Sequence, residues 1–205
     1  MSCGYVLMVL CGCVLANQLL RWPDKLHATL IQNRSGDMGV VELYYDFVRG
    51  FNLNVISALS SRGDPLFDLE LQNGSTYYFR PSDASACKRI DMGVGILRPD
   101  WLEGAGYLGE EKLVLDTKTL VAEKWSQGER PDGKPGVFIT YWNDKETQTP
   151  IKWTFFDNAE FFVIRWEPGV GPEDDSIYSI PQACWETQPT HPRLVRKHDK
   201  VLQKL

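Results

Sequence analysis

Apolar and polar side chains alternate with a period of two along most of the chain. Leu26, Ala28 and Leu30, for example, alternate with polar residues such as Thr29. This period is typical of a β-strand that buries one face and exposes the other. The pattern predicts strands within residues 26–32, 41–47, 52–55, 66–71, 75–80, 88–92, 112–116, 120–126, 137–142, 151–156 and 161–166.

Turn-forming residues separate these runs, as in Ser35-Gly36-Asp37, Asn73-Gly74 and Asp157-Asn158. Short strands joined by such turns indicate an antiparallel all-β domain. No amphipathic helix long enough for a parallel crossover lies between them. About ten strands are too many for a flat sheet. We therefore expect a curled sheet or half-open β-barrel with a short helical cap, with a thick two-layer sandwich as the alternative.

The glycine-rich stretch of residues 92–110 interrupts the strand series. Within it, residues 98–103 can form one or two helical turns, with Pro99 near the start, where its missing N–H costs nothing. Gly104 or Gly106 would end the helix. We expect this segment to cap the open end of the barrel, with Trp101 as the plug. The alternative is a crossover connection that packs on the core.

Several late strands are apolar on both faces, as Phe161 and Phe162 illustrate. A strand of this kind needs cover on both sides, which a core can provide on one side and a ligand cavity on the other. With Trp101 as the cap, the predicted cavity wall consists of Tyr45, Phe47, Tyr78, Phe138, Trp142, Trp153, Phe155, Phe162 and Trp166.

The N-terminal residues 5–16 form an apolar run of signal-peptide length, with small residues before a cleavage site after Ala16. The run is short for a membrane span. The predicted organisation is a signal peptide at 1–16, one β-rich domain at 17–185 and a basic, disordered tail at 186–205. Such a chain travels the secretory route to the extracellular space or cell wall, and its mature form has no stable membrane span.

Cys87 and Cys184 are the two cysteines left after removal of the signal peptide. In a secreted chain two such cysteines form one disulfide more often than two free thiols. Asn33 and Asn73 head Asn-X-Ser sequences at expected turns, so both are candidate glycosylation sites.

The 205 residues carry a formal net charge of −5, which argues against a nucleic-acid partner because such proteins usually present a basic face. The length suits a single domain. The chain has only three histidines, and a catalytic triad in the domain would have to use His27. No nucleophile elbow, phosphate-binding loop or zinc motif occurs. We therefore name no catalytic residue, metal or cofactor.

Acid–base chemistry could instead use carboxylates, as in glycoside hydrolysis. Alternating charge is also the ordinary pattern of a half-exposed strand. The loop at residues 173–176 is acidic but lacks the spacing of a calcium loop, so we expect a solvated loop. The candidate carboxylates are Glu42, Asp46, Asp68, Glu70, Asp100, Glu103 and Glu160.

Three segments carry a resemblance to a known family: MGVGILRPDWLEGAGYLGEE, LHATLIQNRSGDMGVVELYYDF and VFITYWNDKETQTPIKWTFF. They resemble a family of secreted plant and green-algal proteins, mostly uncharacterised, some of which are labelled glycosyl-group transferases. The layout is also similar to ependymin-related proteins and to the periplasmic lipoprotein carrier (LolA-like) fold. The resemblance implies a half-open antiparallel barrel with an apolar ligand cavity.

These observations predict a secreted binding protein that holds an apolar small molecule or lipid in its cavity. The first alternative is a carbohydrate-active protein of the extracellular route, either a glycosyl-group transferase or a sugar binder. The second is a structural wall protein with a filled core. Whether the chain is an enzyme stays open, with the binding role preferred.

Overall fold

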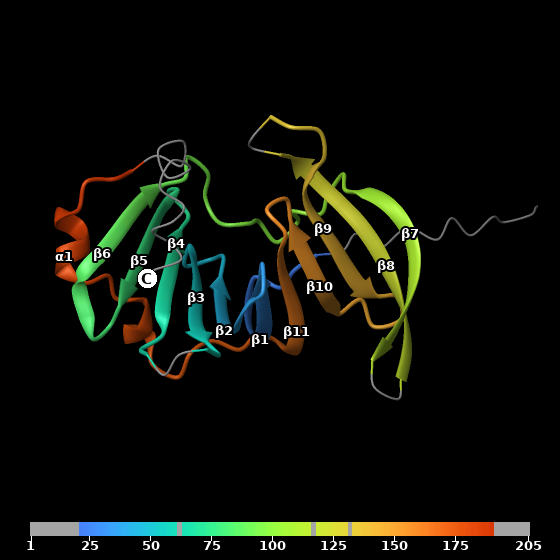
Figure 1. Cartoon of the computed structure of the whole chain (residues 1–205), viewed down its shortest axis with the longest axis horizontal. Coiled ribbons are helices and arrows are strands. Elements are labelled where there is room, and N and C mark those ends of the chain that lie inside the picture. The colour runs from blue at the N-terminus through green and yellow to red at the C-terminus, as the bar shows by residue number, and fades with distance from the viewer. Residues whose placement is uncertain (1–20, 61–62, 116–117, 131–132, 191–205) are drawn as a thin grey trace, which may run out of the picture.

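The protein is built on one open antiparallel sheet of eleven strands, which confirms the predicted fold class (Figure 1). The computed structural model describes residues 21–60, 63–115, 118–130 and 133–190. The sheet order is β6-β5-β4-β3-β2-β1-β11-β10-β9-β8-β7. The strands are β1 Lys25–Arg34, β2 Asp37–Asp46, β3 Phe51–Ala58, β4 Leu66–Leu71, β5 Ser75–Arg80, β6 Asp83–Asp91, β7 Gly106–Leu115, β8 Lys118–Glu129, β9 Val137–Asp144, β10 Pro150–Phe155 and β11 Ala159–Pro168.

The sheet consists of two meanders joined at its centre. Strands β1 to β6 form one and β7 to β11 the other, and β1 pairs with β11 between them. The β1–β2 hairpin turns through Ser35 and Gly36, both in the left-handed region, with φ of 56° and 97°. Two left-handed residues give a two-residue hairpin its natural twist. Since β1 and β11 pair at the centre, β6 and β7 form the two edges of the sheet.

Residues 92–105 connect β6 to β7 and therefore carry the chain from one edge of the sheet to the other. The expected helix at 98–103 is not formed; the segment is a series of turns, in which the Trp101 and Glu103 amides bond to carbonyls three residues earlier. An α-helix would need the carbonyls of Leu97 and Pro99. The Tyr45 hydroxyl donates to the first at 2.8 Å, and the Trp22 amide donates to the second at 2.8 Å. Tertiary contacts thus replace the helical bonds.

One face of the sheet, here called the first face, carries the larger core cluster. Leu26, Ala28 and Leu30 of β1 are buried on it, together with Tyr45 of β2. Trp22 lies at its centre, with its ring 5.3–5.9 Å from those of four other aromatic residues. The crossing segment covers this cluster through Ile96 and Leu102. The alternative prediction, a connection packed on the core, is the one that the structure bears out.

The opposite face, here called the second face, carries a smaller cluster over β3 to β6. Successive side chains of a strand point to opposite faces of the sheet. Leu53 of β3 and Leu69 of β4 are register partners, and both side chains lie on this face. Residues 170–181, here called the strap, cross this cluster and contain the 3₁₀ turn η1 (Asp175–Tyr178). The helix α1 (Gln182–Glu186) follows. The apolar layer therefore changes face between β2 and β3.

The Cys87–Cys184 disulfide joins β6 to α1, as the sequence predicted, with a Cα–Cα distance of 5.2 Å. It holds the chain that follows the strap against the second face. Residues 187–190, assigned above to the tail, also lie along β6, where Thr190 exchanges backbone hydrogen bonds with Arg89 and Asp91. The predicted signal peptide and residues 191–205 lie outside the described residues. Within the part that is described, no helix is long and apolar enough to cross a membrane.

Candidate functional site

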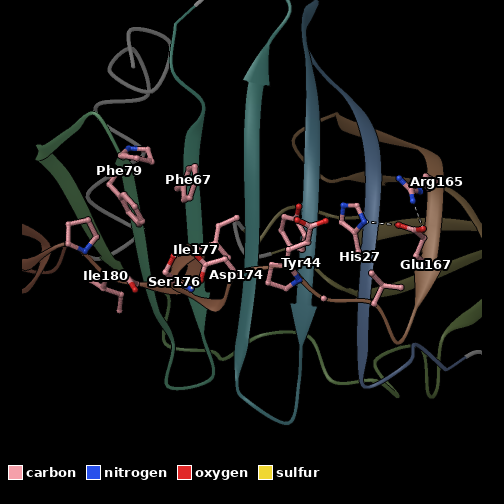
Figure 2. Close-up of a pocket in the computed structure, with 17 residues that line it drawn as sticks. His27, Tyr44, Phe67, Phe79, Arg165, Glu167, Asp174, Ser176, Ile177 and Ile180 are labelled. Atoms are coloured by element: carbon pink, nitrogen blue, oxygen red, sulfur yellow. Dashed lines mark hydrogen bonds and ion pairs between the residues drawn. The ribbon is translucent and has the colours of Figure 1, made fainter.

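A cleft of about 950 Å³ lies between the second face and the strap. Side chains of β1, β2, β4, β5 and β11 form its floor, and the strap forms the opposite wall (Figure 2). Three contacts anchor the strap beside the cleft. Arg49 forms an ion pair with Asp175 at 2.7 Å, and the Tyr178 ring stacks on Phe51 with centroids 4.5 Å apart. The disulfide fixes the chain just beyond.

The apolar end of the cleft lies over β4 and β5. The rings of Phe67 and Phe79 are 5.4 Å apart on its floor, and Ile177 and Ile180 of the strap line the same end. The period of two places both phenylalanines on the second face, since Phe67 pairs with Phe79 in the sheet register. This end offers aromatic and branched aliphatic surface to a ligand.

The polar end lies over β1, β2 and β11 and is organised around His27. The His27 Nδ1 atom is 2.8 Å from Glu167 Oε2, and its Nε2 atom is 2.7 Å from Glu42 Oε2. Thr29 donates a hydrogen bond to the same Glu42 oxygen, and Arg165 donates to the other Glu167 oxygen. Both imidazole nitrogens therefore lie within hydrogen-bond distance of a carboxylate oxygen, one from β2 and one from β11.

The pKa directions agree with this charge arrangement. Hydrogen bonds from His27 and then from Arg165 hold the pKa of Glu167 below its usual range. Burial raises the pKa of the Tyr44 hydroxyl, and the negative charges of Glu42 and Glu173 raise it further. Tyr44 also stacks on the His27 ring, with centroids 4.6 Å apart. The polar end is therefore a region in which carboxylates outnumber the basic side chains His27 and Arg165.

Both nitrogens of His27 are occupied, so the ring positions charge and is not placed to accept a proton from a ligand. The carboxylates lie on opposite sides of the ring and do not converge on one point. Among the described residues, no group of three or more His, Cys, Asp or Glu side chains could hold a metal ion. The arrangement can bind and orient a polar group.

The ten aromatic residues proposed as cap and wall lie elsewhere. None of them lines the cleft. Tyr78 lies over β5 on the first face, and Trp142 and Phe162 lie on the second face, where Lys152 covers both rings. Trp166 also borders a smaller hollow of about 530 Å³. The other seven predicted residues belong to the first-face core cluster: Trp101, Tyr45, Phe47, Phe138, Trp153, Phe155 and Trp166.

The candidate carboxylates separate into different environments. Glu42 reaches the polar end of the cleft, whereas buried Asp46 accepts a hydrogen bond from the Arg49 amide in the β2–β3 turn. Asp100 is paired with Arg98. Glu103 is exposed, and Glu160 is half-buried beside β10. In the acidic loop, both oxygens of Asp174 accept hydrogen bonds from Ser176 and cap η1.

The sequence reasoning missed the strap and the partners Arg165 and Glu167. A signal for the latter was present, because Arg165 and Glu167 share one parity and follow the apolar run of residues 161–164. The strap had only the position of Cys184 as a signal, and a disulfide partner does not reveal the path of the chain.

A second polar cluster lies on the first face of β3 to β5. Asn54 donates to Asp68, and Asn52 donates to Glu70 at 3.0 Å. Burial raises the pKa of the Asp68 carboxyl well above its usual range, and the nearby Glu70 charge adds to this effect. Burial also raises the pKa of Glu70. Asp68 Oδ1 is buried with no hydrogen-bond partner among the described residues.

This cluster predicts a pH-dependent stability with a definite sign. A carboxyl whose pKa is higher in the folded protein than in the unfolded chain stabilises the folded state. This stabilisation is complete when the pH is below the unfolded pKa, and it is lost as the pH rises through the folded pKa. Asp68→Asn should therefore raise the melting temperature at pH 8 and leave it nearly unchanged at pH 4. Each kcal/mol regained corresponds to about 2–4 °C for a chain of this size. Thermal unfolding of both proteins at the two pH values checks this.

The exposed Asp37 provides the control, since Asp37→Asn removes the same charge from a solvated position. An Asp68→Asn variant that melts below the parent protein at pH 8 would contradict the assignment of a destabilised charge.

Comparison with known proteins places the chain in a family. The sequence of residues 21–184 matches a family described as "Domain of unknown function (DUF8395)". The chain belongs to the DUF8395 family. The matched region of this DUF8395 protein ends at Cys184 and so includes the whole sheet and the strap. No curated protein sequence matches it.

Two solved structures are similar to this DUF8395 protein at low identity. One is an uncharacterized conserved protein from Thermus thermophilus, with 10% identity and a TM-score of 0.49, covering 82% of this chain and 91% of that chain. The other is PNGF-II, with 8% identity and a TM-score of 0.38, covering 85% of this chain and 32% of that chain. Neither likeness bears on function.

Proposed function

We propose that this protein binds an amphipathic small molecule, such as a single-chain lipid, in the cleft between the second face and the strap. The observation that supports this is the division of one cavity into two ends of opposite character. Phe67 and Phe79 lie at one end, and the His27–Glu42–Glu167 group lies at the other. A molecule with an apolar chain and a polar head matches this division.

The size of the cleft supports the proposal. Its volume of about 950 Å³ falls within the range of small-molecule sites, roughly 300–1,000 Å³. Burial of one aromatic side chain contributes about 1.5–3 kcal/mol. Phe67, Ile177 and Ile180 are half-buried and can bury further apolar surface against a ligand, whereas Phe79 is already only 4% exposed.

The proposal keeps the apolar ligand that the sequence predicted and assigns it to a different cavity. The aromatic wall predicted from the sequence packs largely on itself and on the crossing segment. The cleft, in contrast, is bounded by the strap, which is held by contacts of Asp175 and Tyr178 and by the disulfide that follows it. Ligand entry then needs displacement of the strap alone, without opening the first-face core.

We also propose an extracellular or secretory location for this binding protein. The Cys87–Cys184 disulfide supports it, because such bonds persist in oxidising compartments. Cleavage after Ala16, glycans on Asn33 and Asn73, and kinship with secreted plant and algal proteins belong to the same proposal. So do the architectural kinships with ependymin-related and lipoprotein-carrier proteins. The chain's sequons both lie beside turns of the sheet.

Titration with N-phenyl-1-naphthylamine, a neutral dye that fluoresces in apolar sites, tests the binding function. We expect a micromolar Kd for the parent protein. Phe67→Ala should weaken binding about tenfold or more, since it removes an aromatic contact worth about 1.5–3 kcal/mol. Phe162→Ala is the matched control, because Phe162 is a half-buried phenylalanine on the same face outside the cleft. Its Kd should stay within about twofold of the parent value.

Absence of dye binding by the folded parent protein would overturn the proposal. Equal weakening by the two alanine variants would also overturn it, because binding would then not depend on the cleft.

A further inference from the structure

The charges at the polar end of the cleft are unbalanced in one direction. The cationic side chains that line it are His27 and Arg165. The two nitrogens of His27 are bonded to Glu167 and Glu42, and Arg165 is bonded to Glu167 at 2.5 Å. Each lining cation is therefore already paired with a carboxylate. An anionic head group would find no uncommitted cationic partner among the described residues of the cleft wall.

Negative charge is in excess at the same end. Glu167, Glu173 and Asp174 line the cleft, and Glu42 lies directly behind His27. Glu173 forms no hydrogen bond or ion pair that the structure records among the described residues. The Tyr44 hydroxyl lies within the field of both Glu42 and Glu173. Two basic side chains, His27 and Arg165, thus face four carboxylates, and Glu173 is the carboxylate available to a ligand.

Lys25 is a further cation close to the cleft. Its side chain runs beneath Gly171 of the strap, where it would clash with a Cβ atom on that glycine. Lys25 itself is not among the lining residues, although its ammonium lies beside Gly171, which lines the cleft. Its position leaves the excess of negative charge at the ligand-facing surface in place.

We infer that the cleft selects amphiphiles with a cationic head, an alkylammonium group that lies between Glu173 and the Tyr44 hydroxyl with its chain toward Phe67 and Phe79. This inference rests on the proposed function and adds the class of ligand. An ammonium group beside Glu173 gains an electrostatic attraction that a neutral head lacks, and an anionic head is repelled. His27 and Arg165 are held by Glu42 and Glu167, so neither basic side chain is free to pair with Glu173.

Competition among three amphiphiles with the same twelve-carbon chain tests the head-group preference. Dodecylamine, dodecyl maltoside and dodecanoate are each titrated against bound N-phenyl-1-naphthylamine at pH 7.5 and low salt, below their micelle concentrations. We expect dodecylamine to displace the dye at concentrations at least about tenfold lower than dodecanoate, with the maltoside between them. Added salt should reduce the difference between the displacing concentrations of dodecylamine and dodecanoate, because ions screen exposed charges.

A pair of variants locates the preference. Dodecylamine should displace the dye at a lower concentration than dodecanoate does, and Glu173→Gln should reduce this concentration difference about threefold or more. Glu146→Gln, an exposed position in the β9–β10 turn outside the cleft, is the control and should leave the difference unchanged.

The outcomes separate the two claims. If the dye does not bind, the proposed function fails. If the dye binds but dodecanoate displaces it as well as dodecylamine does, the cationic preference is wrong and the binding function stands. If dodecyl maltoside displaces it best, the head-group inference is likewise overturned in favour of a sugar head.

Discussion

Replacement of both bridged cysteines, Cys87→Ala with Cys184→Ala, should lower the free energy of unfolding by about 4–5 kcal/mol. The bridge spans a sequence separation of 97 residues, and cross-links that close long loops restrict the unfolded chain most in the chain-entropy model. For a chain of this size the loss corresponds to a melting temperature about 8–20 °C lower. Because the bridge also fixes the chain beyond the strap, dye affinity should fall as well. Urea unfolding and dye titration measure the two effects.

Reduction of the parent protein gives a matched control for this experiment. Dithiothreitol should move the parent's unfolding midpoint toward that of the double variant and leave the variant unchanged. If the oxidised parent and the double variant unfold at the same urea concentration, the disulfide does not secure the C-terminal segment as described.

Trp22→Ala should destabilise the protein by about 3–5 kcal/mol, the usual cost of truncating a large buried aromatic residue. Trp22 is 6% exposed, and its ring contacts those of Tyr45, Trp101, Trp153 and Trp166. Its indole also donates to the Tyr141 hydroxyl at 3.3 Å. The substitution removes the centre of the first-face cluster and the main support of the crossing segment. Urea unfolding monitored by circular dichroism gives the free energy.

Trp185→Ala is the control, since Trp185 is 58% exposed on α1. Its effect should stay within about 1 kcal/mol, as for most surface substitutions. Similar losses for the two variants would show that Trp22 is not the centre of the core. A loss confined to Trp22→Ala, with dye affinity retained at low urea, would also separate the first-face core from the cleft.

The strands were predictable because their signal is local. The alternation of Leu26, Ala28 and Leu30 requires a half-buried strand wherever that strand lies in the sheet. All eleven predicted runs overlap an observed strand, and hairpin turns such as Ser35-Gly36 fix the order of neighbours within each meander. The cysteine pair followed from the count of cysteines left after the expected cleavage.

The distribution of core and cleft could not be predicted from the same signal. Parity shows that Tyr45 and Tyr44 face opposite sides but does not show which side is covered. The structure covers the first face at β2 and the second face at β3. The aromatic residues assigned to one wall also divide between the faces, since Trp142 and Phe162 have the parity opposite to the core residues Tyr141 and Phe161. That change of face depends on where the crossing segment and the strap pass, and neither path is encoded in strand periodicity.

The turns at residues 98–103 and the setting of His27 show the same limit. A helix there was reasonable from Pro99 and Gly104, but the Trp22 amide and the Tyr45 hydroxyl take the carbonyls that the helix would use. His27 meets Glu42 from the next strand and Glu167 from the far end of the chain. The first partner was a candidate carboxylate in the sequence, whereas the second required the central β1–β11 pairing.

Native mass spectrometry of the protein purified from a eukaryotic secretory host, followed by organic extraction and analysis of the extract, directly tests whether the cleft holds a ligand. We expect a bound amphipathic molecule that is retained by Phe162→Ala and lost or depleted in Phe67→Ala. A ligand-free mass, together with no uptake of any amphiphile from a mixed lipid extract, would contradict it. The same spectrum reports the glycans on Asn33 and Asn73 and the two-hydrogen mass deficit of the disulfide.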